Sequence, residues 1–137
     1  MPPLTRWFVK SALVCFIAAL LVGVSIAARA LFNLPPVISA LQPVYFHLLM
    51  VGWITQLIFG VAFWMFPKFS REQPRGSERL GWATFALLNG GLLLRVVGEP
   101  LAATQAGAGW LIALSAVLQW LAGMAFVINS WARVKER

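Results

Sequence analysis

Four ionisable side chains lie near the ends of long apolar stretches in this sequence, and their types indicate which chemistry the chain could perform. They are Arg29, His47, Arg95 and Glu99. An ionisable group within a membrane span is costly and is therefore a reason to look for a function. His47 is the only histidine and Cys15 the only cysteine in the sequence. Within one copy, this excludes multi-histidine metal sites, thiolate zinc or iron–sulfur sites, and disulfides.

One imidazole together with two guanidinium groups matches the needs of a b-type haem. The iron takes a neutral imidazole nitrogen, the macrocycle needs an apolar cleft between helices, and the two propionates pair with cations near water. We therefore expect His47 to ligate the iron and Arg29 and Arg95 to meet the propionates. The aromatic rings of Tyr45 and Phe46 are expected to pack along the edge of the haem.

Plainer explanations remain open for the same residues. His47 could be an interfacial side chain that is hydrogen-bonded to a loop carbonyl, and Arg29 could mark the end of its helix. Arg95 and Glu99 are four residues apart, which is the spacing of an ion pair along one helix. Deeper amides favour hydrogen bonds between helices, at Gln56, Asn89 and Gln119. Small residues favour close helix packing, at Gly52, Gly60, Gly90, Gly91 and Gly123.

The elements that position these residues are predicted to be membrane helices. The chain has 137 residues, of which 61% are hydrophobic and only 11% are charged, too few charges to cover a soluble domain of this size. Four stretches are long enough to cross a bilayer, at about residues 7–31, 44–66, 80–98 and 110–131. Each is apolar on all sides, and prolines are expected to end the first three, at Pro35, Pro36, Pro67 and Pro100. We predict one all-α domain over residues 1–137, a polytopic four-helix bundle.

The distribution of lysine and arginine predicts the orientation of this bundle. If four helices alternate, nine cations fall on one side of the bilayer: Arg6, Lys10, Lys68, Arg71, Arg75, Arg79, Arg133, Lys135 and Arg137. Positive residues mark the cytoplasmic side, so both termini are predicted to be cytoplasmic, in the plasma membrane of a bacterium or archaeon. We expect no nucleic-acid partner, because no soluble basic module is present. His47 and Arg95, each about three residues from its helix end, then share an outer layer with Arg29.

The N-terminal segment permits a second interpretation. Residues 1–30 have a basic start, an apolar run and then "AARA", which is similar to a signal-peptide cleavage site. The apolar run is longer than usual for a signal peptide, and Arg29 beside the cut is unfavourable. Cleavage would leave the topology of the other three helices unchanged.

The second stretch, "YFHLLMVGWITQLIFGVAFWMFPKF", resembles the second helix of the large subunit (subunit I) of haem-copper oxidases and their nitric oxide reductase relatives. In that family the histidine near the outer face is an axial ligand of the low-spin haem, and the resemblance implies this role for His47. It covers about 25 residues, with matching features at His47, Met50, Val51, Gly52, Ile58, Phe59, Gly60, Trp64 and Pro67.

This chain departs from the family in length and in ligands. Four helices replace about a dozen, and no second histidine is present, so the chain by itself is not a complete terminal oxidase. Three sources remain for a second axial ligand. Two copies could place both His47 side chains on one haem across a two-fold axis. The sixth position could instead stay open to a gas, or a partner subunit of a respiratory complex could fill it.

Two functions of other classes compete with a haem protein in electron transfer or gas binding. The chain could be a cofactor-free accessory or assembly subunit of a respiratory membrane complex, using its small residues against partner helices. It could also be a small transporter or channel. A transport path would need polar groups at mid-membrane, and the only candidates, Gln56, Asn89 and Gln119, are not ionisable.

Overall fold

Long apolar runs form four helical spans in the computed structural model, which describes residues 1–71 and 74–134. The first span is α1 (Pro3–Phe32), and the third and fourth are α4 (Glu78–Thr104) and α5 (Gly109–Trp131). The second, Pro36–Met65, is divided into η1 (Pro36–Leu41), α2 (Gln42–His47), η2 (Leu48–Thr55) and α3 (Gln56–Met65). All four spans are long and apolar enough to cross a membrane. The described residues contain no strand, so the all-α prediction is confirmed.

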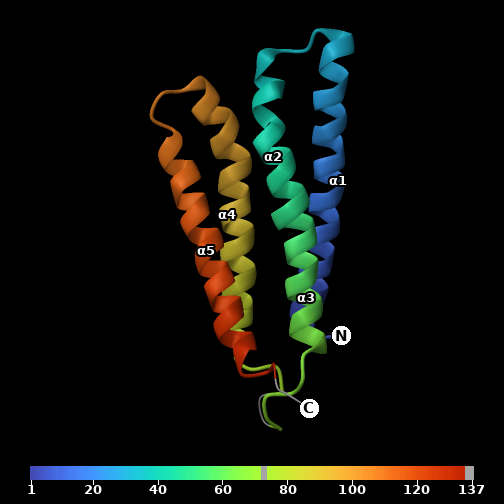
Figure 1. Ribbon diagram of the computed structural model, residues 1–137, viewed down its shortest axis with the longest axis vertical. Helices are drawn as coiled ribbons and strands as arrows, with labels where there is room; N and C mark the ends of the chain where they lie inside the picture. The colour runs from blue at the N-terminus through green and yellow to red at the C-terminus, as the bar shows by residue number, and fades with distance from the viewer. Residues whose placement is uncertain (72–73, 135–137) are drawn as a thin grey trace.

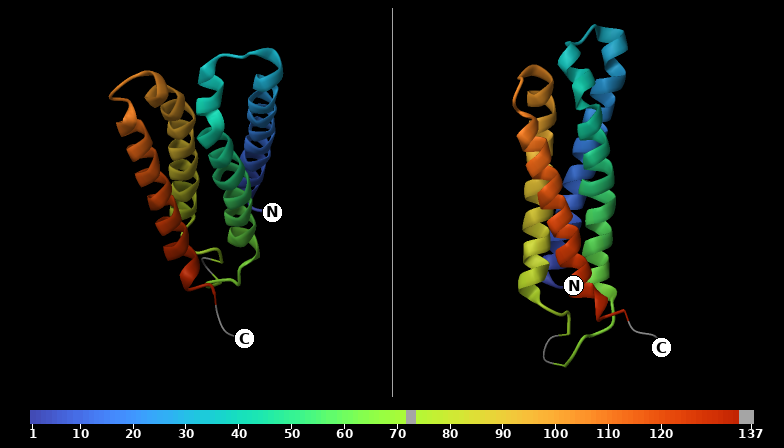
Figure 2. Two further views of the ribbon diagram at one scale, coloured as in Figure 1. Left: turned by 45° about the horizontal axis from the view of Figure 1, so that its top comes forward. Right: turned by 60° about the vertical axis from the view of Figure 1, so that its left-hand side comes forward.

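The spans run antiparallel and form two pairs. α1 packs along the second span, and α4 packs most extensively against α5. The start of α1 and the end of α5 lie at one end of the bundle, here called the terminal end, and α2 lies toward the opposite far end (Figure 1). Between the two pairs, α4 also contacts η1, α2 and η2 of the second span, and further views show α4 beside that span (Figure 2). An aromatic stack between Phe59 and Phe126, with ring centroids 3.9 Å apart, joins α3 to α5.

Two helix boundaries differ from the sequence prediction. The second span begins at Pro36 with a 3-10 segment, and α4 continues through Pro100 to Thr104. The prediction that Pro100 ends the third helix is wrong. Proline removes only one backbone donor, and the hydroxyl of Thr104 donates to the carbonyls of Pro100 and Leu101, at 3.2 Å each. The connection between α4 and α5 is correspondingly short.

The longer helices change the depth of the predicted site residues. By residue count, His47 lies 11 positions after Pro36 and Arg95 lies nine positions before Thr104. Both therefore stand further from their helix ends than the three residues that the sequence predicted. Arg29 lies only three positions before Phe32, the end of α1. In its distance from the helix end, His47 is therefore closer to Arg95 than to Arg29, although the sequence predicted one common layer for all three.

A π-helical segment follows His47 directly and was not predicted. η2 covers Leu48–Thr55, and the Thr55 hydroxyl donates to the carbonyl of Met50, five residues earlier, at 2.8 Å. π-Helical turns are rare in proteins, and many of those that do occur lie at functional sites. The histidine therefore stands at the boundary between a regular turn and a widened one.

Three of the five glycines predicted to allow close packing do so. A Cβ at Gly60 would lie 2.6 Å from the Phe8 Cβ, and one at Gly52 would lie 2.8 Å from Cys15 and Leu92. Gly91 packs against α5, where the Ser115 hydroxyl donates to the Gly91 carbonyl at 2.7 Å. At Gly90 and Gly123, apart from the adjacent backbone of the same helix, no atom of the described residues lies within 4 Å of the place where a Cβ would stand. The close packing predicted for these two glycines is therefore not formed within one chain.

The predicted amide bonds between helices are not formed as expected. Gln56 is fully buried, yet neither its Nε2 nor its Oε1 has a hydrogen-bond partner among the described residues. Asn89 donates within α4, to the carbonyl of Phe85. Gln119 donates within α5 to Ser115, at 3.2 Å, and it is Ser115 that makes the bond to the next helix.

Candidate functional site

His47 is the last residue of α2, and its ring is held by its own helix. Its Nδ1 lies 2.9 Å from the carbonyl oxygen of Pro43, four residues earlier. A carbonyl oxygen only accepts, so Nδ1 must carry the proton that is shared in this bond. The neutral ring then has its lone pair on Nε2. Histidines that bind metals are commonly oriented through such a bond from the other ring nitrogen.

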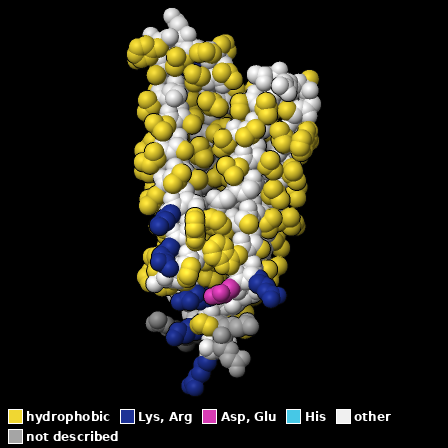
Figure 3. Space-filling view, turned by 180° about the vertical axis from the view of Figure 1, so that it is seen from behind, with side chains coloured by type: hydrophobic (Ala, Val, Ile, Leu, Met, Phe, Trp, Pro, Cys, Tyr) yellow, Lys and Arg dark blue, Asp and Glu magenta, His cyan; other side chains and the backbone are white. Residues whose placement is uncertain are grey.

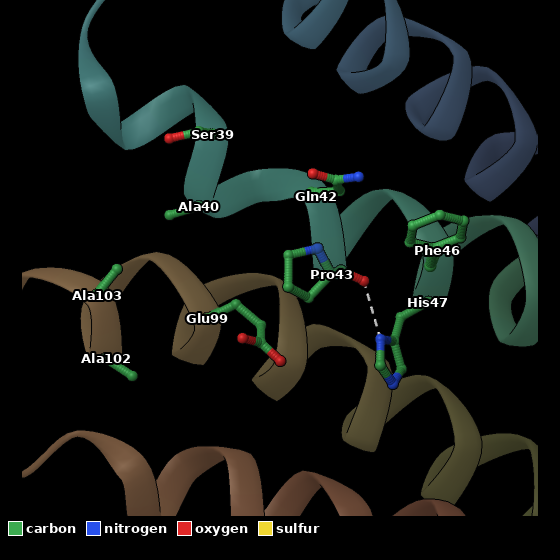
Figure 4. Close-up of a pocket in the computed structure, with 9 residues that line it drawn as sticks. All are labelled: Ser39, Ala40, Gln42, Pro43, Phe46, His47, Glu99, Ala102 and Ala103. Atoms are coloured by element: carbon green, nitrogen blue, oxygen red, sulfur yellow. Dashed lines mark hydrogen bonds between the residues drawn. The ribbon is translucent and has the colours of Figure 1, made fainter.

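The His47 ring lines a cleft between the second span and α4. The cleft has a volume of about 670 Å³, within the usual range for ligand pockets. The His47 ring extends from α2 toward α4, and Glu99 projects from the α4 wall (Figure 4). The remaining lining is mostly apolar or small and consists of Ser39, Ala40, Gln42, Pro43, Phe46, Ala102 and Ala103. Ala102 and Ala103 contribute because α4 continues past Pro100.

Arg95 adjoins this cleft through Glu99. Its Nη1 lies 3.1 Å from the Glu99 Oε1, and the two side chains are only 14% and 16% exposed. The ion pair along one helix, left open from the sequence, is confirmed. The Arg95 Nε is buried and has no partner among the described residues. Of this pair, Glu99 lines the cleft and Arg95 does not.

Arg29 and Tyr45 are directed elsewhere. Arg29 is exposed and lines a separate recess of about 410 Å³ at the end of α1, together with Asn33. The ring of Tyr45 packs on α1, 3.0 Å from where a Cβ at Gly23 would stand. It also contacts the Phe46 ring, with centroids 5.4 Å apart. The structure therefore brings His47 close to the Arg95–Glu99 pair and does not bring Arg29 or Tyr45 into the same cleft.

The donor set fits a group that supplies most of its own metal ligands. Among the described residues no three histidine, cysteine, aspartate or glutamate side chains gather closely enough to hold a metal ion. A porphyrin already provides four nitrogens, so it needs from the protein only an axial ligand, apolar walls and cations. The cleft offers the His47 Nε2 and small apolar walls, and its charged lining residue is Glu99, which is paired with Arg95 outside the lining. It offers no second histidine, methionine or cysteine among its lining residues.

Sequence reasoning missed the fixation of the histidine ring and the opposite wall of the cleft. The spacing of Pro43 and His47 could have indicated the bond, because a histidine can reach the carbonyl four residues earlier in a helix. Nothing in the sequence indicated that Ala102 and Ala103 face His47. No protein-family model, curated protein or solved structure matches this chain.

Proposed function

We propose that this chain is a multi-pass membrane protein that binds haem b in the far-end cleft, with the Nε2 of His47 as an axial iron ligand. Its role would be electron transfer or the binding of a gas. The observation that carries the proposal is the bond from Nδ1 to the Pro43 carbonyl at 2.9 Å. This bond fixes the tautomer of His47, and it orients the ring so that the lone pair of Nε2 points into a mostly apolar cleft. The resemblance of the second span to subunit I of haem-copper oxidases supports the same assignment.

Each wall of the cleft has a defined task in this proposal. Bound haem supplies an iron centre for one-electron transfer or for binding a gas. Phe46 and the small residues of α4 exclude water from the ring faces. Arg95, which is paired with Glu99 of the α4 wall, would supply the positive charge for a propionate. Arg29, in its separate recess, would contribute only at the outer rim.

The proposal also concerns the second ligand of the iron and the orientation of the chain in the membrane. One chain supplies one strong ligand, so the sixth position belongs to a second copy of His47, to a gas, or to a partner subunit. A homo-oligomer with paired His47 residues is the first of these to test. The excess of lysine and arginine at the terminal end favours cytoplasmic termini in a bacterial or archaeal plasma membrane.

The haem-to-protein ratio of the purified chain tests the proposal. We expect a stoichiometric ratio for the wild type when haem supply is not limiting, and loss of most haem from His47→Ala. Ser39→Ala changes another lining residue of the same cleft and should retain the haem. A colourless wild type, or equal haem content in both variants, would contradict the assignment.

A second candidate function is a cofactor-free accessory subunit, and the open glycines favour it. Gly90 on α4 and Gly123 on α5 face open space, and bare backbone of this kind lets a partner helix approach closely in a membrane. Purification in a mild detergent separates the two functions. A stoichiometric set of partner proteins without haem would support the accessory role and contradict the haem proposal.

A further inference from the structure

The described parts of the loop that joins α3 to α4, residues 66–71 and 74–77, contact the end of α5. Arg133, counted from the sequence among the cations of the cytoplasmic side, is only 1% exposed. Its guanidinium donates to the carbonyls of Phe63 at 3.0 Å, Phe66 at 2.8 Å and Pro67 at 3.1 Å. A weaker bond of 3.4 Å reaches the Arg75 carbonyl. Both ends of the loop are therefore tied to one buried side chain.

Asn129 and the loop backbone fix the rest of the connection. The Ser77 N–H donates to the Asn129 Oδ1 at 2.9 Å, and the Asn129 Nδ2 donates to the Ser77 carbonyl at 3.2 Å. Gly76 has φ +72°, and a Cβ there would lie 2.6 Å from the Asn129 Oδ1. Within the loop, the Phe69 N–H donates to the Pro74 carbonyl at 3.1 Å. The loop is thus built around specific contacts.

This fixed loop gathers cations around a recess. A cavity of about 500 Å³ is lined by Lys68, Ser70, Arg71, Pro74 and Arg75. The described part of the loop contains no aspartate or glutamate, and Glu72 lies outside the described residues. Burial, and after it the charge of Arg75, lower the pKa of Arg133, so Arg75 acts unfavourably on Arg133. An anion in the recess would relieve that repulsion.

The position of the recess identifies the kind of anion. The loop begins directly after Met65, the last residue of the second span. Trp64 and Trp82, on the two helices that the loop joins, are 44% and 41% exposed, and tryptophan prefers the headgroup level of a bilayer. The space-filling view shows lysine and arginine side chains gathered at this end, below an apolar surface (Figure 3). The recess therefore lies where lipid phosphates are the most abundant anions.

We propose that Lys68, Arg71 and Arg75 form a binding site for the phosphate headgroup of an anionic phospholipid. The three cations surround the phosphate, and Arg133 holds the loop that carries them. The site lies at the terminal end and is independent of the haem proposal.

Lipid association in nanodiscs tests the site. The full-length chain is placed in phosphatidylcholine nanodiscs that contain a small fraction of spin-labelled phosphatidylglycerol or phosphatidylcholine. The motionally restricted fraction of each label gives the preference for the anionic lipid. The test variant is Lys68→Gln/Arg71→Gln/Arg75→Gln. The control, Arg6→Gln/Lys10→Gln/Arg79→Gln, removes three cations at the same end but outside the recess.

We expect the wild type to prefer the anionic label. In the test variant this preference should fall at least about fivefold, which is the effect of losing one interfacial cation. The control should retain most of the preference. Equal losses in both variants would show a diffuse effect of the basic end and overturn the proposal. Loss of the preference on adding inorganic phosphate, at ionic strength matched with chloride, would assign the recess to a free anion and would also overturn it. Thermal melting checks that the test variant is folded, and Arg75→Lys, which keeps the charge, should behave like the wild type.

Discussion

The chemistry of the far-end cleft depends on a few side chains that use some of their polar atoms in hydrogen bonds and leave other polar atoms without a partner among the described residues. His47 uses one ring nitrogen on the Pro43 carbonyl and keeps the other free. Arg95 uses one nitrogen on Glu99 and keeps its buried Nε without a partner among the described residues. Buried polar groups normally find partners. The unused groups at the cleft are therefore the ones that a ligand would satisfy.

Replacing Glu99 tests whether Arg95 serves a bound anion. In Glu99→Gln the largely buried guanidinium loses its counter-charge, and we expect the haem-free protein to lose about 1–3 kcal/mol of stability. Added haem should raise the melting temperature of this variant more than that of the wild type, because a propionate replaces the missing carboxylate. Glu78→Gln, at an exposed position in the first turn of α4, is the control and should respond to haem as the wild type does. An equal gain in melting temperature for wild type and Glu99→Gln would contradict the role given to Arg95.

Gln56 is a second residue with unused polar atoms, and replacing it should stabilise the fold. Its amide is completely buried without a partner among the described residues, so an apolar side chain of similar shape avoids a desolvation cost. We expect Gln56→Met to gain about 1–2 kcal/mol in unfolding free energy. Gln119→Met, which loses the bond to Ser115, should lose stability by about 1 kcal/mol. Chemical denaturation in detergent would measure both. A loss at position 56 would mean that its amide has a partner.

At the scale of elements, the spacing between helices decides at which positions a small residue is needed for close packing. Gly90 and Gly91 are neighbours in the sequence, yet only Gly91 meets α5, where a Cβ would lie 2.9 Å from the Gln119 Cγ and 3.0 Å from the Ser115 carbonyl oxygen. At such distances the backbone of α5 would have to move. Gly90 has open space around the same position.

This pair of neighbours provides a direct test of the packing between α4 and α5. We expect Gly91→Ala to destabilise the bundle by about 1–3 kcal/mol through overpacking. Gly90→Ala should be neutral or stabilising by up to about 1 kcal/mol, because alanine favours the helix. Thermal melting in the same detergent would compare them. Similar melting temperatures for the two variants would contradict the close approach at Gly91.

The elements also show what could be predicted from the sequence. The four spans followed from apolar length alone, because a span needs about 20 apolar residues. The π-helical segment Leu48–Thr55 has no sequence signal of that kind. The continuation of α4 through Pro100 depends on backbone bonds that one proline does not abolish. The depths predicted for His47 and Arg95 were wrong because the second span begins earlier, at Pro36, and the third ends later, at Thr104, than the sequence predicted.

At the scale of the whole molecule, the two helix pairs are joined along their length, by Val44, Leu48 and Leu92 toward the far end and by a second cluster toward the terminal end. Phe8, Phe63 and Leu88 form a buried cluster that connects α1, α3 and α4, and Arg133 lies over the rings of Phe63 and Phe66 at 5.7 and 5.9 Å. The far end also carries the cleft. A count of charges could assign Arg133 to one side of the membrane but could not reveal that the folded loop surrounds it.

Removing the Arg133 guanidinium should therefore weaken the whole bundle. Arg133→Gln leaves several carbonyls of α3 and the following loop without their donor, and we expect a loss of about 2–4 kcal/mol in unfolding free energy. Arg79→Gln, at an exposed position of α4, should change stability by less than about 0.5 kcal/mol. Denaturant titrations of both variants would measure the difference. Equal stability of Arg133→Gln and Arg79→Gln would contradict the account of the terminal end.

The absorption spectrum of His47→Gly, recorded with and without added imidazole, tests the central claim most directly. The wild type should show a Soret band and the reduced α and β bands of a b-type haem. The variant should lack the wild-type spectrum and regain it when imidazole occupies the space of the missing ring. A wild type without a Soret band under full haem supply, or a variant whose spectrum equals that of the wild type without imidazole, would contradict the assignment of His47 as the iron ligand.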